Sequence, residues 1–123
     1  MQNLDQLRAA HALPAAKLTD KSSVAKLPAM ILTNGLLATL AFACEAGKSK
    51  RDKMQVAADE LAKHLAHAAF SLTDLAGCKS GADLNARLAK GDALTLQRAT
   101  TESLAFLSYL KRFAEKKADR DDA

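Results

Sequence analysis

Three side chains that are able to bind a metal ion lie within two turns of one predicted helix. Glu60 precedes His64 by four residues and His67 follows by three, so all three fall on one helical face. Imidazole and carboxylate groups suit zinc, but such a site needs a further ligand from a second element, and His11 is the only other histidine. We therefore favour a polar face in which Glu60 supports His64, and we predict no metal and no cofactor.

Groups for catalysis are equally sparse. Serines and threonines occur without a nucleophile motif, and no Gly-rich phosphate loop is present. Asp59 and Glu60 are adjacent and point in different directions, whereas general acid–base chemistry needs carboxylates aimed at one point. A small metal-dependent or hydrolytic enzyme that uses Glu60, His64 and His67 stays as an alternative. We predict a protein that is not an enzyme and takes no small-molecule substrate.

Basic side chains give the stronger indication of a binding site, in a chain with a formal net charge of +4. One cluster precedes the third predicted helix and another lies in the last predicted helix. Phosphate backbones attract such clusters by counterion release, and one Tyr with no Trp leaves little for base stacking. The alternative is a set of solvated helix ends, where cations favour the helix dipole. The candidate RNA-binding residues are Lys48, Lys50, Arg51, Lys53, Lys111 and Arg112.

The composition predicts an all-α fold in one domain. Ala and Leu dominate, the β-branched residues Val and Ile are rare, and aromatic residues make up only 4% of the 123 residues. We predict one helical domain over residues 1–118, followed by an acidic, disordered tail over residues 119–123. Leu27 to Cys44 carries no charge, but its Pro, Asn, Gly and Thr residues favour a buried helix over a membrane span. Without a signal-peptide pattern, a cytoplasmic protein is expected.

The apolar periodicity predicts a compact bundle of four main helices with one or two short extra helices. The first runs from about Leu4 to Leu13, where Pro14 either ends or kinks it. Asp20 or Ser22 caps the second, which tolerates Pro28 if that residue lies in the first turn. Its i, i+3, i+4 pattern continues across Asn34-Gly35 to a stop near Gly47. Gly35 within a helix costs up to roughly 1 kcal/mol, which close approach of a neighbouring helix would offset.

Apolar spacing and glycine positions in the second half of the chain predict the remaining helices. Apolar residues spaced alternately by four and three run from Met54 to Leu72, which is typical of bundle packing. A loop over 71–81 leads to a short helix from Asp83 to Ala89, closed by Gly91. The last helix begins near Asp92 or Thr95 and buries one face as far as Phe113.

Three motifs resemble one protein family. The run LPAMILTNGLLATLAF, Leu27 to Phe42, is similar to the signature of the small fifth subunit of the type III-B (Cmr) CRISPR RNA-silencing complex. The opening LDQLRAAHA, Leu4 to Ala12, resembles the family's N-terminal pattern, and YLKRFAEKKA, Tyr109 to Ala118, resembles its closing one. The segment from Gly47 to Thr95 carries no motif of this kind.

The resemblance implies an all-α, non-catalytic subunit that supports antiviral RNA silencing. Its expected partners are other Cmr subunits, further copies of itself, and guide and target RNA contacted through their phosphate backbones. Base pairing would supply sequence specificity, and target cleavage would belong to the backbone subunits. The alternative is a stand-alone helical adaptor or regulatory protein that binds protein partners without RNA.

Overall fold

The computed structural model describes residues 3–45 and 49–114, and within them every regular element is helical. The α-helices are α1 (Leu4–Leu18), α2 (Lys21–Asn34), α3 (Leu36–Ala43), α4 (Ser49–Leu65), α5 (Gly81–Lys90) and α6 (Ala93–Phe113). Two 3₁₀ turns, η1 (Ala68–Phe70) and η2 (Thr73–Leu75), connect α4 to α5. The all-α prediction is confirmed, while the predicted tail lies outside the described residues.

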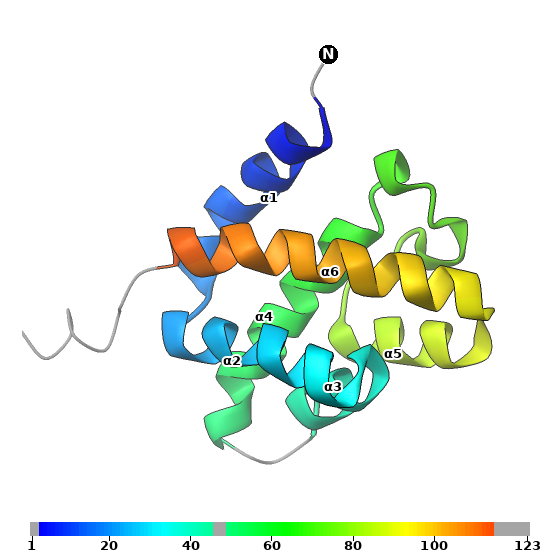
Figure 1. The fold of residues 1–123 in the computed structure, drawn as a ribbon. Coiled ribbons are helices and arrows are strands. Elements are labelled where there is room, and N and C mark those ends of the chain that lie inside the picture. Colours follow the sequence, from blue (N-terminus) through cyan, green and yellow to red (C-terminus); the bar gives the residue numbers. More distant parts are fainter. Residues whose placement is uncertain (1–2, 46–48, 115–123) are drawn as a thin grey trace, which may run out of the picture.

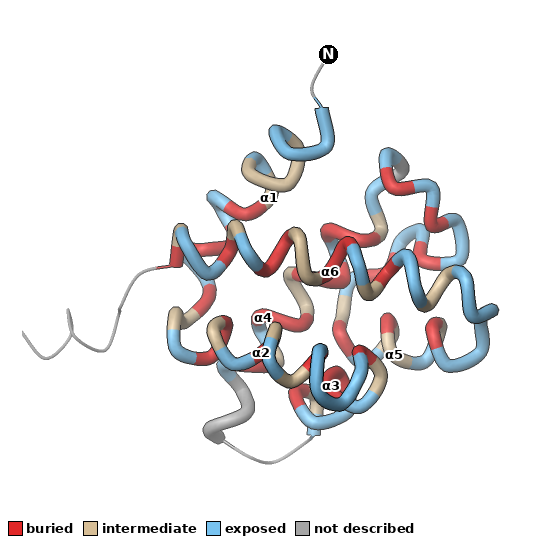
Figure 2. Tube along the Cα trace, in the orientation of Figure 1, coloured by how far each residue is buried: buried red, intermediate tan, exposed pale blue. Residues whose placement is uncertain are grey.

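The longest helix, α6, organises the others. It crosses the molecule, with α1 and α2 packed along its C-terminal half and α4 behind it (Figure 1). On the other side of the molecule α5 packs against α3 and α4. Buried residues, mostly Ala and Leu, follow the inward faces of all these helices (Figure 2). Small side chains allow close helix packing, although each buries little apolar area.

The first helix is longer than predicted. It begins with a capping box between Asn3 and Gln6 and continues through Pro14 to Leu18, so the predicted end at Leu13 is wrong. Proline cannot donate the bond that the carbonyl of Ala10 would accept, but Ala10 is exposed and water can serve instead. The residues beyond the proline, Ala15 and Ala16, are buried, and this tertiary packing holds the extra turn.

The second predicted helix is two helices. Asp20 caps α2, as one of the two predicted alternatives required, but Pro28 lies in the third turn instead of the first. At Gly35 the backbone has φ 90° and ψ 162°, a conformation that is not helical and is essentially restricted to glycine. The Gly35 N–H donates to the carbonyl of Ile31, and its carbonyl accepts the N–H and hydroxyl of Thr39. The prediction of one continuous helix was therefore wrong.

The break also changes which residues are buried. The continuous pattern placed Leu37, Ala38 and Ala41 inward, whereas Ala38 and Ala41 are exposed and Leu37 is only partly buried. The buried residues of α3 are Leu36, Thr39, Leu40 and Ala43. No neighbouring atom lies within 4 Å of a Cβ built at Gly35, so the expected close approach at this glycine is wrong as well.

Close helix approach occurs at Gly81 instead. A Cβ there would lie 2.7 Å from Ala58 Cβ and 2.8 Å from Cys44 Sγ, so only glycine fits. The Gly81 N–H also donates to Asp59 Oδ1 at 2.8 Å, which anchors the start of α5 on α4. The predicted short helix and its stop at Gly91 are confirmed, and Asp92 caps α6.

The third predicted helix was too long. Met54, Ala58, Leu61 and Leu65 are buried on α4 as expected, but the helix ends at Leu65. The next turn tightens, because the His67 N–H donates to His64 three residues back, and His67 Nδ1 accepts the N–H of Ala69. Leu72 is buried from the following loop.

Candidate functional sites

A charged cluster lies between the first, fourth and last α-helices. Arg8 on α1 donates to both oxygens of Glu102 on α6, with Nε–Oε2 at 2.8 Å and Nη2–Oε1 at 2.7 Å. The Arg8 side chain is 19% exposed and that of Glu102 only 9%. A two-point guanidinium–carboxylate pair fixes orientation as well as charge. It therefore sets how α1 lies on α6.

His64 on α4 extends this cluster. Its Nε2 lies 2.8 Å from Glu102 Oε2, and its Nδ1 lies 2.8 Å from His11 Nδ1. An ionised Glu102 only accepts hydrogen bonds, so His64 Nε2 carries the proton in the neutral ring. His64 Nδ1 must then accept from His11 Nδ1–H. The resulting Glu102–His64–His11 chain ends at His11 Nε2.

Burial and charge keep this chain in that protonation state. Burial would raise the pKa of Glu102, but hydrogen bonds from Arg8 and His64 outweigh it and lower that pKa. For His64, burial is the largest effect and lowers its pKa despite the opposing Glu102 carboxylate. Burial also lowers the pKa of His11, helped by the nearby His64 and His67. The Phe106 ring stacks on His64 at 4.1 Å and excludes water from it.

The predicted polar face of α4 is organised differently from expectation. Glu60 accepts from Lys63 at 3.0 Å, and His64 takes its carboxylate partner from α6, so Glu60 does not support His64. His67 Nδ1 is used by the N–H of Ala69. In residues 3–45 and 49–114 no group of three or more His, Cys, Asp or Glu side chains could hold a metal ion. Nor do Asp59 and Glu60 converge, because Asp59 accepts the Gly81 N–H.

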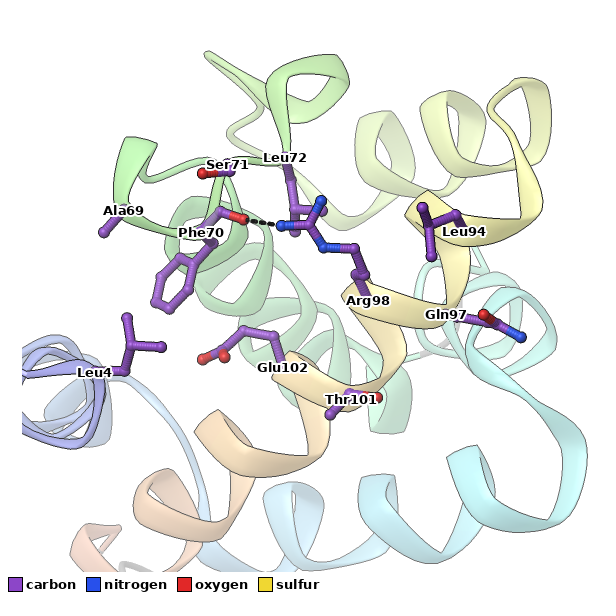
Figure 3. Close-up of a pocket in the computed structure, with 10 residues that line it drawn as sticks. All are labelled: Leu4, Ala69, Phe70, Ser71, Leu72, Leu94, Gln97, Arg98, Thr101 and Glu102. Atoms are coloured by element: carbon purple, nitrogen blue, oxygen red, sulfur yellow. Dashed lines mark hydrogen bonds between the residues drawn. The ribbon is translucent and has the colours of Figure 1, made fainter.

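A cleft that Glu102 also lines has a volume of about 460 Å³. Leu4 and Phe70 line one end, and Leu94 and Gln97 lie at the other (Figure 3). Arg98 donates to the Phe70 carbonyl at 3.0 Å, which holds the segment after α4 against α6. Two of the polar residues that line this cleft, Arg98 and Glu102, are thus engaged in structural bonds.

The predicted RNA-binding residues divide into described and undescribed ones. Lys53, Lys111 and Arg112 are exposed. Lys48 lies outside the described residues, and Lys50 and Arg51 are described only as backbone in the first turns of α4.

Helix α2 connects the two basic clusters. It contacts α6 on one side and α4 on the other. Asp20, the cap of α2, has its pKa lowered mainly by a hydrogen bond from Ser22, and the charge of Lys53 on α4 contributes. The start of α4 and the end of α6 therefore flank the same short helix.

A groove between α2 and α6 collects part of this charge. It has a volume of about 330 Å³. We call it the basic groove, and its lining residues are Lys21, Pro28, Leu104, Ser108, Lys111 and Arg112.

No pattern in the sequence indicated the Arg8–Glu102–His64–His11 cluster as a unit. Arg8 and Glu102 are separated by 94 positions, and no local spacing connects them. One signal was available, because Glu102 follows Ala99 by three residues and so falls next to the predicted buried face of the last helix. A carboxylate on such a face needs a cationic partner.

The fold and these sites define a small all-helical protein with a buried ion-pair cluster and a basic groove. Residues 4–117 match the family described as CRISPR-associated protein (Cas_Cmr5), and the chain therefore belongs to that family. The match includes residues 47–95, where no motif had been apparent, and it confirms the resemblance to the type III-B small subunit. The family implies association with other Cmr subunits. No curated protein and no solved structure matches the chain.

Among the described helices none is both long enough and apolar enough to cross a membrane. The stretch from Leu27 to Cys44 is divided by the break at Gly35.

Proposed function

We propose that this chain is a non-catalytic small subunit of a type III-B CRISPR effector complex and lines the channel in which target RNA pairs with guide RNA. The observation that carries the proposal is the family match over residues 4–117. Other Cmr subunits and further copies of this chain would be its protein partners, and the complex would act in antiviral defence in the cytoplasm. RNA would be contacted through phosphates, since sequence is read by base pairing.

The charge distribution of the described residues supports a role for the basic clusters. Arg8 and Arg87 form ion pairs with carboxylates, and Arg98 donates to a backbone carbonyl. Among the described residues Lys111 and Arg112 have no such partner, and both are exposed. Cations without an internal counter-charge stay available for an external anion. Lys48, Lys50, Arg51 and Lys53 are proposed from the sequence to act with them.

A purification of the tagged chain, with and without ribonuclease, tests the proposal. Cmr backbone subunits and short guide RNAs are expected together in the untreated sample, with protected RNA fragments in the treated one. Partners that remain attached with no protected RNA would instead indicate the adaptor function.

Charge reversal tests the basic cluster at the start of α4. Lys50→Glu with Arg51→Glu is expected to weaken target-RNA capture by the assembled complex. Lys79→Glu with Lys90→Glu is the matched control. Both lysines are exposed, and neither belongs to the basic clusters, since Lys79 precedes α5 and Lys90 is its last residue. Unchanged capture with the first pair would remove these two residues from the RNA-binding surface.

A further inference from the structure

We propose that the basic groove between α2 and α6 seats one phosphodiester of an RNA strand, with the adjoining ribose and base packed on its apolar end. This inference rests on the proposed function and assigns one part of its RNA-contacting surface to a defined site. The groove has a volume of about 330 Å³, within the range of small-ligand sites.

The helical spacing explains why these residues share one groove. On α6, Leu104, Ser108 and Arg112 follow at intervals of four, and Lys111 lies three after Ser108, so they occupy one face. On α2, Lys21 and Pro28 are seven residues apart and also share a face. The two helices contact each other, and both faces line the groove.

The direction of the helices separates a charged end from an apolar end. The two helices run in opposite directions, so the start of α2 lies beside the end of α6 (Figure 1). Lys21 therefore joins Lys111 and Arg112 at one end of the groove, and Pro28 joins Leu104 at the other. A nucleotide has the same division into an anionic phosphate and a less polar sugar and base.

The side chains at the charged end form no ion pair or side-chain hydrogen bond within the described part of the chain. Lys21, Lys111 and Arg112 form no ion pair there, and the Ser108 hydroxyl has no hydrogen-bond partner. Among the described residues that line the groove, every charged one is a cation and none is a carboxylate. Such a site favours an anion with several acceptor oxygens.

Helix dipoles do not account for the whole arrangement. Lys111 and Arg112 lie in the last turn of α6, where positive charge is favourable. Lys21 is the first residue of α2, where the dipole disfavours a cation. An external anion held between the two helix ends gives Lys21 a partner that its own helix does not.

The test uses the reconstituted complex and a target RNA with photo-crosslinkable uridines. Lys21→Gln combined with Lys111→Gln and Arg112→Gln removes the charges and keeps good helix formers. We expect about a tenfold or greater loss of target-RNA affinity, with the crosslink to the groove lost. Lys21→Gln alone, which changes only α2, should also lower the target-RNA affinity, but by less. Lys79→Gln with Lys90→Gln is the control and should bind as the unaltered chain does.

The outcomes separate this inference from the proposed function. RNA that crosslinks to this chain away from the groove, with unchanged affinity in the triple variant, overturns the inference and leaves the proposed function intact. RNA that never crosslinks to this chain in an assembled complex overturns both. A folded triple variant that no longer joins the complex would make the groove a protein interface and overturn the phosphate seat. Thermal unfolding of each variant establishes that it is folded.

Discussion

His64 Nε2 and Glu102 Oε2 lie 2.8 Å apart, and this contact joins α4 to α6 inside the core. The same carboxylate accepts two hydrogen bonds from Arg8 of α1. One side chain thus connects three helices. Because Glu102 is nearly enclosed, its charge depends on both partners for compensation.

Substituting Glu102 tests that dependence. Glu102→Gln removes the buried counter-charge of Arg8 and leaves its guanidinium only the exposed Asp5 carboxylate. Breaking such a buried pair costs about 3 kcal/mol in unfolding free energy. Glu60→Gln is the matched control, because its partner Lys63 is 54% exposed, so that solvent screens the pair and it contributes about 0–1 kcal/mol. Urea unfolding measures both. Equal losses in the two variants would mean that Glu102 carries no special share of the stability.

Acid should destabilise the fold in a defined pH range. The pKa values of His64 and His11 are lowered by burial from 6.5, so the unfolded chain binds protons first as the pH falls. The contribution of these two histidines to the free energy of unfolding is therefore fully present above about pH 6.5 and declines below it. Protonating His64 would also put two donors face to face at the His11 contact. The pKa of Glu102 is lowered from 4.5, so a second loss follows below that pH.

Thermal unfolding between pH 7.5 and 5 measures this dependence. His64→Gln keeps a donor for Glu102 but cannot be protonated, so its unfolding temperature should change less over the same range. A variant that follows the parent at every pH would show that other groups cause the acid sensitivity.

Gly35→Ala should destabilise the protein for a purely conformational reason. The φ of 90° with ψ of 162° is a glycine conformation, and an alanine there costs about 1–3 kcal/mol. No atom lies near enough to clash with the added methyl group. Gly91→Ala is the control for backbone conformation, since φ there is −83°, and its methyl group would lie 3.3 Å from the Arg87 carbonyl oxygen. Chemical denaturation should show the larger loss at position 35, and the reverse order would contradict the assigned backbone.

Gly81→Ala should destabilise the protein by a steric clash and not by backbone strain. The new methyl group would overlap Ala58 Cβ and Cys44 Sγ, and overpacking of this kind costs about 1–3 kcal/mol. Combining it with Cys44→Ala removes one of the two clashes and should recover part of the loss in urea unfolding. If the second substitution recovers nothing, the sulfur is not the limiting contact.

Pro14→Ala should stabilise the chain. It restores an N–H donor for the carbonyl of Ala10 in the middle of α1 and removes a residue that costs up to about 3 kcal/mol inside a helix. The gain will be reduced because proline also restricts the unfolded chain. Differential scanning calorimetry measures the change. A lower unfolding temperature would mean that the proline ring itself packs usefully beside His11, with which it lines a shallow hollow.

The sequence predicted the helices best where local chemistry determines them. Asp20 was one of the two predicted caps of the second helix, and the last helix was predicted to begin near Asp92 or Thr95. The predicted core face of α6 was correct at Ala99, Phe106 and Leu110. These features depend on residues three or four apart, which a single sequence displays directly.

The errors occurred where apolar periodicity carries no information about backbone angles. Apolar residues recur before and after the Asn34-Gly35 pair, so a helix through the glycine and a break at it leave nearly the same pattern. At Pro14 the local rule predicted a stop or a kink, but the helix does not stop there, because burial of Ala15 and Ala16 in the tertiary structure holds the further turn. The buried cluster was missed because its members come from α1, α4 and α6, and their meeting depends on the whole fold.

The pairing of Arg8 with Glu102 also has a consequence during protein synthesis. Residues 94 positions apart must both have left the ribosome before this pair can form. At about 5–20 residues per second, α1 waits several seconds for the segment on which it docks. During that interval its Ala-rich inner face has no partner from α6. The nascent chain is therefore open to chaperones or to misassociation until α6 has emerged from the ribosome.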